Sequence, residues 1–211
     1  MKIVCISDTH NLHRHYGRHP FGEIPTADAI IHAGDVTTHG TLDELNQFLT
    51  WFSNLPHPIK IFIAGNHDRI LESDVTFAIP KHITYLKNSA TTLPNGLKVW
   101  GSPYTPKHQD FAFQLSTHEF ADNLWNSIPE DTDILITHGP PLGILDGNSH
   151  IGCSMLLDKC NKIKPRYHIF GHDHASYGWL HLNQTTFINA SVHTWLWKQT
   201  QRMEPPVITL P

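Results

Sequence analysis

The sequence has little cysteine and no long apolar run. Its three cysteines, Cys5, Cys153 and Cys160, are an odd number without a C-x-x-C pair, so neither a disulfide framework nor a thiolate zinc site is indicated. The apolar run at residues 2–6 is too short for a secretory signal or a membrane span, because Asp8 follows it closely. We therefore expect a cytoplasmic protein without a membrane partner.

Positive charge is also scarce. Lysine and arginine number 15 against 19 aspartates and glutamates, which gives a formal net charge of −4. A protein that holds DNA or RNA neutralises phosphates with a stripe of basic residues, whereas the basic residues of this chain are dispersed. A stable nucleic-acid partner is therefore disfavoured, and the sequence leaves the oligomeric state open.

Histidine, in contrast, is abundant, because its 18 copies outnumber all the lysines and arginines. Imidazole is the commonest metal ligand in proteins and a general acid or base near neutral pH. The chain has 211 residues, 39% of them hydrophobic and 16% charged, which suits a compact fold and disfavours disorder. We expect a single domain over residues 1–211, since no stretch is long, polar and featureless enough to be a linker.

Short apolar, β-branched runs alternate with polar or amphipathic stretches. Such runs are typical of strands buried on both faces. They lie at residues 2–6, 29–33, 59–64, 83–86, 97–100, 134–137 and 167–170. The alternation of strands and helices predicts an α/β layered domain, and residues 179–189 predict an antiparallel hairpin.

Helical spacing is clearest between the second and third runs. Thr41 is the predicted N-cap, with Glu44 three residues later as its capping-box partner. The apolar stripe that follows consists of Leu42, Leu45, Phe48, Leu49 and Phe52. Two weaker stripes are formed by Phe120, Leu124 and Ile128, and by Met155, Leu156, Cys160 and Ile163.

Five polar clusters each follow an apolar run. They are Ser7-Asp8-Thr9-His10, Gly34-Asp35, Gly65-Asn66-His67-Asp68, Thr137-His138-Gly139 and Gly171-His172-Asp173-His174. The carboxyl ends of strands in α/β sheets are where ligands bind, because the strand fixes the backbone and the loop carries the functional groups. We expect the five clusters to converge on one site.

The donor groups in these clusters indicate a metal site. They are carboxylates, imidazoles and one amide, and this mixture suits manganese, iron, cobalt, nickel or zinc better than an oxygen-only magnesium or calcium cage. Asp8 and His10 are two residues apart, as are His172 and His174, so each pair projects to one face of an extended segment. Since the donors exceed the needs of one ion, two metal ions that share a carboxylate are the simplest hypothesis.

The order Asp-x-His, Gly-Asp, Gly-Asn-His-Asp, His-Gly, Gly-His-x-His resembles the calcineurin-like metallophosphoesterase superfamily. All five blocks occur in order between Asp8 and His174. The text at residues 101–106, 138–143 and 189–191 is similar to the small metallophosphoesterase-domain-containing phosphodiesterases. The resemblance implies a four-layer α/β/β/α sandwich of two mixed β-sheets flanked by helices.

The resemblance also implies seven metal ligands around two ions. The ligands of one ion are Asp8, His10 and His174, those of the other are Asn66, His138 and His172, and Asp35 bridges the two. His67 is implied to stay off the metals and to protonate the leaving oxygen or stabilise phosphoryl charge, with Asn66 and His67 both facing the substrate. Asp68 is expected to orient His67 or a neighbouring ligand.

We therefore expect a dinuclear-metal-dependent phosphoesterase in which a metal-bridging hydroxide attacks phosphorus. Its expected substrates are phosphodiesters, cyclic nucleotides among them, or small phosphomonoesters. Two divalent transition-metal ions are the expected cofactors; manganese is favoured, and iron, zinc, cobalt or nickel also fit. The alternative is a catalytically weak metal-binding regulatory protein on the same fold. A mononuclear iron oxygenase is disfavoured by the surplus of ligands.

Two further features have competing interpretations. The histidine- and arginine-rich stretch at residues 13–19 predicts a solvated loop, or alternatively a loop in which Arg14 or Arg18 grips phosphate. Trp195 and Trp197 share a face if their segment is extended, which favours core packing over stacking on a nucleobase.

Overall fold

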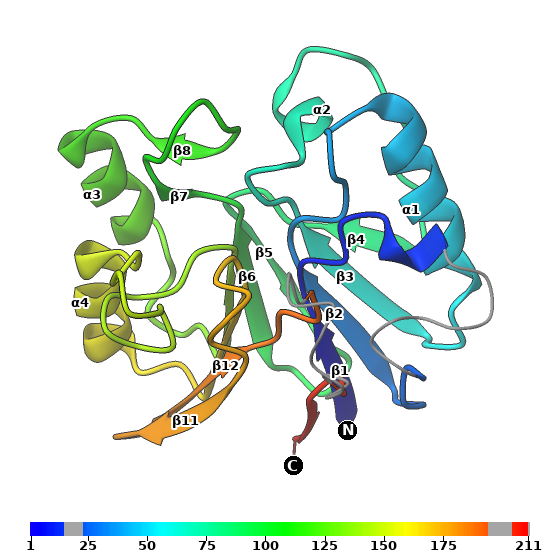
Figure 1. Cartoon of the computed structure of the whole chain (residues 1–211). Helices are drawn as coiled ribbons and strands as arrows, with labels where there is room; N and C mark the ends of the chain where they lie inside the picture. Colours follow the sequence, from blue (N-terminus) through cyan, green and yellow to red (C-terminus); the bar gives the residue numbers. More distant parts are fainter. Residues whose placement is uncertain (15–22, 194–203, 211) are drawn as a thin grey trace.

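The computed structural model describes residues 1–14, 23–193 and 204–210 (Figure 1). Most of the stretch at residues 13–19 lies outside the described residues, and so do Trp195 and Trp197. The interpretations that the sequence offered for those segments therefore stay predictions.

The first sheet has five strands in the order β13-β1-β2-β3-β4. Its four parallel strands are β1 (Lys2–Ile6), β2 (Ala29–Ala33), β3 (Ile59–Ile63) and β4 (Ile83–Tyr85). Strand β13 (Val207–Thr209) adds an antiparallel edge beside β1. The sheet is therefore mixed, and its parallel strands end on one common edge.

The second sheet has six strands in the order β11-β12-β10-β9-β6-β5. Strands β12 (Thr185–Asn189), β10 (Tyr167–Phe170), β9 (Ile134–Thr137) and β6 (Lys98–Ser102) run parallel. The antiparallel edges are β5 (Ser89–Thr92) and β11 (Gly178–Leu182), and β11 pairs with β12 as the predicted hairpin. A separate short pair joins β7 (Thr105–Pro106) to β8 (Gln114–Leu115).

Three apolar layers separate four layers of secondary structure. The middle layer lies between the sheets and contains alternate strand residues such as Ile3, Ile31, Ile136 and Ile169. A second layer packs the other face of the first sheet against α1, and a third packs the second sheet against α3 and α4 (Figure 1). Because side chains alternate along a strand, each sheet buries both faces, and the predicted α/β/β/α sandwich is confirmed.

Helix α1 (Leu42–Asn54) begins as the sequence predicts. The Thr41 hydroxyl accepts a hydrogen bond from the Glu44 amide at 3.2 Å, and the Glu44 carboxylate accepts one from the Thr41 amide at 3.1 Å. This reciprocal pair satisfies amide groups that the first helical turn leaves without partners. The buried face carries four of the five predicted apolar residues, whereas Leu42 in the first turn is 38% exposed.

The remaining helices are short. They are α2 (Arg69–Glu72), α3 (His118–Asn126) and α4 (Ser154–Ile163), with a 3-10 helix at Leu12–Arg14. The two weaker apolar stripes correspond to α3 and α4, although Ile128 lies just beyond the end of α3. None of the helices in the described ranges combines the length and apolarity that crossing a lipid bilayer requires.

Candidate metal centre

Five loops meet where the carboxyl ends of the two sheets approach each other. The Asp8 amide donates to the Gly34 carbonyl at 2.9 Å, which joins the loops after β1 and β2. The His172 amide donates to the Asp8 carboxylate at 3.1 and 3.2 Å, which joins the second sheet to the first. The Gly171 amide donates to the His138 carbonyl, and the His67 amide donates to Asp35 Oδ1, so hydrogen bonds connect all five predicted clusters.

Three overlapping groups of side chains have the spacing of metal ligands. They are Asp8, His10 and His174; Asp8, Asp35 and His138; and His10, Asp35 and His67, with the ligand atoms of each group within 4.8 Å of one another. The shortest charged contacts are 3.3 Å, between His174 Nε2 and Asp8 Oδ1 and between His138 Nε2 and Asp35 Oδ2. Asp8 and Asp35 each belong to two of the three groups, so the candidate ligands form one continuous cluster.

The main chain sets the orientation of the imidazoles. Nδ1 of His10 lies 3.2 Å from the Thr37 carbonyl oxygen, and Nδ1 of His138 lies 2.9 Å from that of Ala33. A carbonyl only accepts, so each Nδ1 carries the proton and donates it. Nε2 of each ring therefore points into the cluster, as outer contacts to metal-binding histidines commonly arrange.

The charge balance of the cluster suits a divalent cation. Asp8 and Asp35 are 0% and 2% exposed, and buried carboxylates need a compensating positive charge. Burial opposes ionisation of Asp35, but the charge and hydrogen bond of His138 hold the pKa of that carboxyl well below its usual range. Burial also opposes the charged form of His138 and on its own lowers the pKa, but the neighbouring Asp35 outweighs burial and raises the pKa of His138 to about 9. The carboxylates thus attract a cation into a space where imidazole nitrogens also converge, and the residues fit a metal centre.

His10 and His172 behave as neutral donors. Burial lowers the pKa of His10 to about 4 and that of His172 to about 4. A histidine must be neutral to bind a metal, so these two rings can do so at neutral pH. His172 packs edge-on against His138, with ring centroids 5.1 Å apart, but it falls outside the three close groups.

Asn66 also points into the cluster. Its side-chain oxygen lies 3.0 Å from His138 Nε2. The contact between this loop and the Ala112 amide is made by the backbone carbonyl of Asn66 and does not use its side chain. The structure therefore brings all seven predicted ligands, and His67, to one place.

The backbone at the cluster is strained. Four of the predicted ligands adopt left-handed φ angles, namely Asp8 (58°), His10 (39°), Asp35 (55°) and His172 (70°). Such conformations are rare outside glycine and gather at functional sites. Gly171 allows the second sheet to approach, because a Cβ there would lie 2.1 Å from Asp8 Oδ2. The fold holds these side chains together at an energetic cost.

Asp68 acts on the backbone of the Asp35 loop and not on the ring of His67. Its buried carboxylate accepts hydrogen bonds from the Thr37 amide at 2.8 Å, the Val36 amide at 3.2 Å and the Gly65 amide at 2.8 Å. Burial and the neighbouring Asp35 raise its pKa to about 6. Of the two roles expected for Asp68, orienting His67 is therefore wrong, and supporting a neighbouring ligand loop agrees with the contacts.

Several site residues escaped the sequence prediction. The His193 ring is buried, with its centroid 5.0 Å from that of His10 and 4.7 Å from that of His174. His32 and His168 are buried in β2 and β10 and hydrogen-bond to Thr9 and Thr137, which adjoin predicted ligands. These histidines lie outside the five blocks, and histidine abundance was the one signal that pointed to them.

A cavity of about 330 Å³ opens over the cluster. Its walls combine predicted site residues with others from the loop between β7 and β8 and the loop after β10. The lining residues are Asp35, Asn66, His67, His108, Gln109, Phe111, His172, Asp173, His174 and Ala175. A substrate in this cavity would contact the candidate metal ligands directly.

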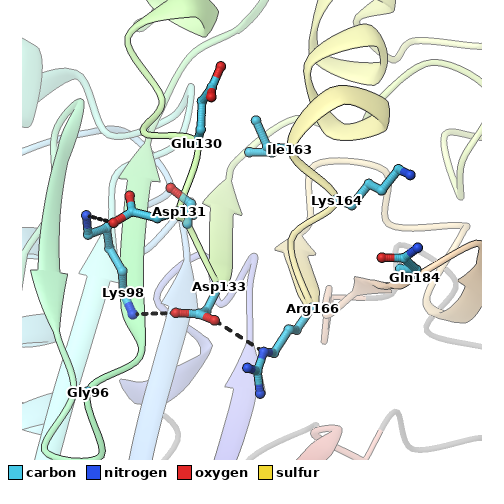
Figure 2. A pocket seen from close by; sticks show the side chains of 10 residues that line it. Gly96, Lys98, Glu130, Asp131, Asp133, Ile163, Lys164, Arg166 and Gln184 are labelled. Carbon is cyan, nitrogen blue, oxygen red and sulfur yellow. Dashed lines mark hydrogen bonds and ion pairs between the residues drawn. The ribbon is translucent and has the colours of Figure 1, made fainter.

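A second cavity, of about 540 Å³, lies where β6, β9 and β10 begin. Figure 2 shows Lys98 and Arg166 turned toward aspartates there. Lys98 pairs with Asp131, and Arg166 Nε lies 3.2 Å from Asp133. Since these charges are partly or fully exposed and neutralise one another, this cavity lacks the buried, concentrated donors of the first.

Comparison with known proteins finds a family model and two relatives that match most of this chain. Residues 1–176 match the family model described as calcineurin-like phosphoesterase. The chain is 34% identical over 237 residues to metallophosphoesterase domain-containing protein 1 of Homo sapiens, covering 98% of this chain and 70% of that protein. It is 38% identical over 210 residues to a UPF0046 protein of Caenorhabditis elegans, covering 90% and 69% respectively.

Two other similarities are narrower. A probable rhamnogalacturonate lyase C of Emericella nidulans is 40% identical over 193 residues, but this chain spans only 17% of its length. Among solved structures, a phosphopantetheinyl hydrolase of Mycobacterium tuberculosis superposes with a TM-score of 0.61 at 14% identity, over 90% of this chain and 89% of that one. The latter similarity is one of fold.

Proposed function

The chain belongs to the calcineurin-like phosphoesterase family of metal-dependent hydrolases, and from this premise we propose that it is a dinuclear-metal phosphodiesterase. One observation carries the proposal. Two buried carboxylates, Asp8 and Asp35, gather imidazole nitrogens from both sheets into overlapping groups whose ligand atoms lie within 4.8 Å. Shared carboxylates between neighbouring groups suit a two-metal centre.

In this proposal seven side chains hold two ions. The first ion takes Asp8, His10 and His174, the second takes Asn66, His138 and His172, and Asp35 is common to both. Bound metal ions supply Lewis acidity, which lowers the pKa of coordinated water and neutralises phosphoryl charge. Manganese is our preferred metal, since the mixed oxygen and nitrogen donors suit it.

His67 is the proposed acid for the leaving oxygen. Its Nδ1 lies 2.9 Å from the Thr38 carbonyl oxygen, which fixes the ring and leaves Nε2 as the nitrogen available to the substrate. A proton on Nε2 can pass to the oxygen that leaves phosphorus. His67 also belongs to a close group with His10 and Asp35, so metal counting in a His67 variant separates the acid role from a ligand role.

The cavity favours a small diester as substrate. A phosphodiester carries one negative charge, and a monoester carries nearly two at neutral pH. The described residues that line the cavity carry imidazoles, amides, an aromatic ring and carboxylates, and include no lysine or arginine. Positive charge for the phosphoryl group would therefore come mainly from the metals, and a diester needs less of it than a monoester. Cyclic nucleotides are the first natural diesters to test.

A reducing compartment such as the cytoplasm is part of the proposal. The three cysteines are buried as free thiols, and burial raises the pKa of Cys5 and Cys160 above the usual range. Free thiols persist where glutathione and thioredoxin keep the medium reducing.

The test is manganese-dependent hydrolysis of bis-p-nitrophenyl phosphate beside p-nitrophenyl phosphate. We expect turnover of the diester that chelation abolishes and added manganese restores. Preference for the monoester would redirect the proposal to phosphatase substrates. Metal binding without turnover of either compound would contradict it and favour a metal-binding regulatory protein.

A further inference from the structure

The loop between β7 and β8 places two aromatic rings beside the cluster of candidate metal ligands. His108 and Phe111 both line the cavity, and their rings are nearly parallel, with an interplanar angle of 12° and centroids 6.3 Å apart. Phe111 is half-buried and His108 is exposed. Parallel rings at the wall of a cavity present π faces on which a planar group can stack.

This pair of rings adjoins the proposed acid. The Phe111 ring centroid lies 4.9 Å from that of His67, at an interplanar angle of 42°. A group that stacks there occupies the side of the cavity from which His67 reaches the substrate. That side holds the leaving alcohol of a phosphoester if His67 protonates the leaving oxygen.

Hydrogen bonds fix this loop to the site. The Ala112 amide donates to the Asn66 carbonyl at 3.0 Å, and the Phe113 amide donates to the Glu72 carboxylate at 2.9 Å. The Arg69 guanidinium donates to the Asp110 carbonyl, and its carbon lies 6.0 Å from the centre of the Phe111 ring. Such anchoring lowers the entropy that would be lost when the loop binds a ligand.

Resting on the proposed phosphoesterase function, we infer that Phe111 and His108 form a stacking shelf that selects phosphoesters whose leaving alcohol carries a planar aromatic group. The class includes aryl esters and esters of nucleosides. The rings discriminate by shape and π character, so a saturated ring of similar size gains less. His67 supplies the acid, and the shelf determines which alcohol lies beside it.

The test compares phenylphosphonate with cyclohexylphosphonate as ligands of the manganese-loaded protein. The two share the phosphonate that metals bind and differ in the planarity of the ring. Calorimetry should find that phenylphosphonate binds about five-fold more tightly, in keeping with a single stacking contact. Phe111→Leu, which keeps an apolar side chain, should reduce this preference to about two-fold or less.

Two further variants complete the test. His108→Ala changes an exposed side chain and should lose part of the preference with an unchanged melting temperature. Trp179→Leu removes an aromatic ring that is 67% exposed on β11, outside the cavity, and should keep the full preference.

The inference is overturned if the parent protein binds both phosphonates equally, binds neither, or keeps its preference in Phe111→Leu and His108→Ala. Hydrolysis of bis-p-nitrophenyl phosphate by the same preparation reports on the proposed function separately. If the protein hydrolyses the diester but does not prefer phenylphosphonate, the proposed function stands and the stacking shelf is contradicted. If the protein prefers phenylphosphonate but does not hydrolyse the diester, the stacking shelf stands and the proposed function is contradicted.

Discussion

Charged residues beyond the carboxyl ends of the two sheets are buried, whereas those at the amino end of the second sheet are more exposed and pair with one another. At the carboxyl end, Asp8 and Asp35 are buried, meet imidazoles within 3.5 Å and stand on left-handed backbone. At the amino end, Asp131 and Arg166 are 70% and 53% exposed and pair with opposite charges (Figure 2). The amino-end cavity is the larger, at about 540 Å³ against about 330 Å³.

Cavity size is therefore a poor guide to the site in this molecule. Exposed ion pairs contribute little to stability, and because their charges already compensate one another they do not require a bound ion. Buried carboxylates that share imidazoles cost desolvation and strain, and that cost is repaid when a cation binds. Concentrated, buried charge therefore marks the carboxyl ends of the two sheets, where we place the chemistry.

The sharpest contrast comes from neutralising one aspartate at each end. Asp35→Asn removes the charge common to both proposed metal positions, and we expect kcat/KM for bis-p-nitrophenyl phosphate to fall by about a thousand-fold. Asp133→Asn, the matched change in the larger cavity, should leave kcat/KM within about two-fold. Comparable losses in both variants would erase the distinction between the two ends.

Removing the proposed acid should have the next largest effect. For His67→Gln we expect kcat to fall by about a hundred-fold on esters with poor leaving groups, because a general acid assists departure of the alcohol. Esters of p-nitrophenol should lose less, since that alcohol leaves readily. Metal content should stay at the parent level. Equal losses on good and poor leaving groups would argue against an acid role.

Metal binding should stabilise the carboxyl end. With free manganese at about a hundred times its Kd, we expect the free energy of unfolding to rise by about 2.7 kcal/mol for each independent site. Urea denaturation with and without manganese measures the rise. Asp133→Asn should show the full rise, and Asp35→Asn should lose much of it. A rise that survives in Asp35→Asn would place the metal elsewhere.

The buried interior of the second sheet should be acid-sensitive, at His168 in β10. Burial lowers the pKa of His168 from 6.5 to about 3, so the unfolded chain takes up a proton there that the folded chain refuses. Stability from this group is present above pH 6.5 and is lost as pH falls toward 3. Between about pH 7 and pH 5 the loss is about 2 kcal/mol. Urea denaturation of His168→Gln should no longer show this pH-dependent loss in the free energy of unfolding. His82→Gln, which changes an exposed histidine, should still show it.

The smallest effect belongs to the amino end. Arg166→Gln breaks the ion pair with Asp133, whose nearest atoms are 3.2 Å apart, and Arg166 is half exposed. We expect a loss of about 0.5 kcal/mol in the free energy of unfolding that is further reduced in high salt. A loss above about 2 kcal/mol would show that this end matters more for stability than its exposure suggests.

Much of the fold could be predicted because its strands are short, apolar and buried. The runs at 2–6, 29–33, 134–137 and 167–170 coincide with β1, β2, β9 and β10. Strand β5 and strand β13 escaped prediction because their exposed positions give no continuous apolar run. Strand β6 extends to Ser102, since Gly101 and Ser102 pair with Ile136 and Thr137 in β9, a contact that local sequence does not encode.

The site could be predicted where its residues stand next to strand ends. Asp8, Asp35 and His138 lie within two residues of the ends of buried strands, so strand position implies their meeting. His193 and Phe111 reach the cluster through loops whose course depends on packing between distant segments, and spacing alone could not place them. The role of Asp68 depended on three backbone amides, which sequence does not locate.

We propose that the carboxyl ends of the two sheets hold a two-metal centre organised by Asp35. The most direct measurement is the number of manganese ions bound per chain, by elemental analysis of reconstituted and desalted protein, in the parent and in Asp35→Asn. We predict two ions in the parent and at least one fewer in Asp35→Asn. A parent that binds one ion or none, or an Asp35→Asn variant that keeps two, would contradict the account.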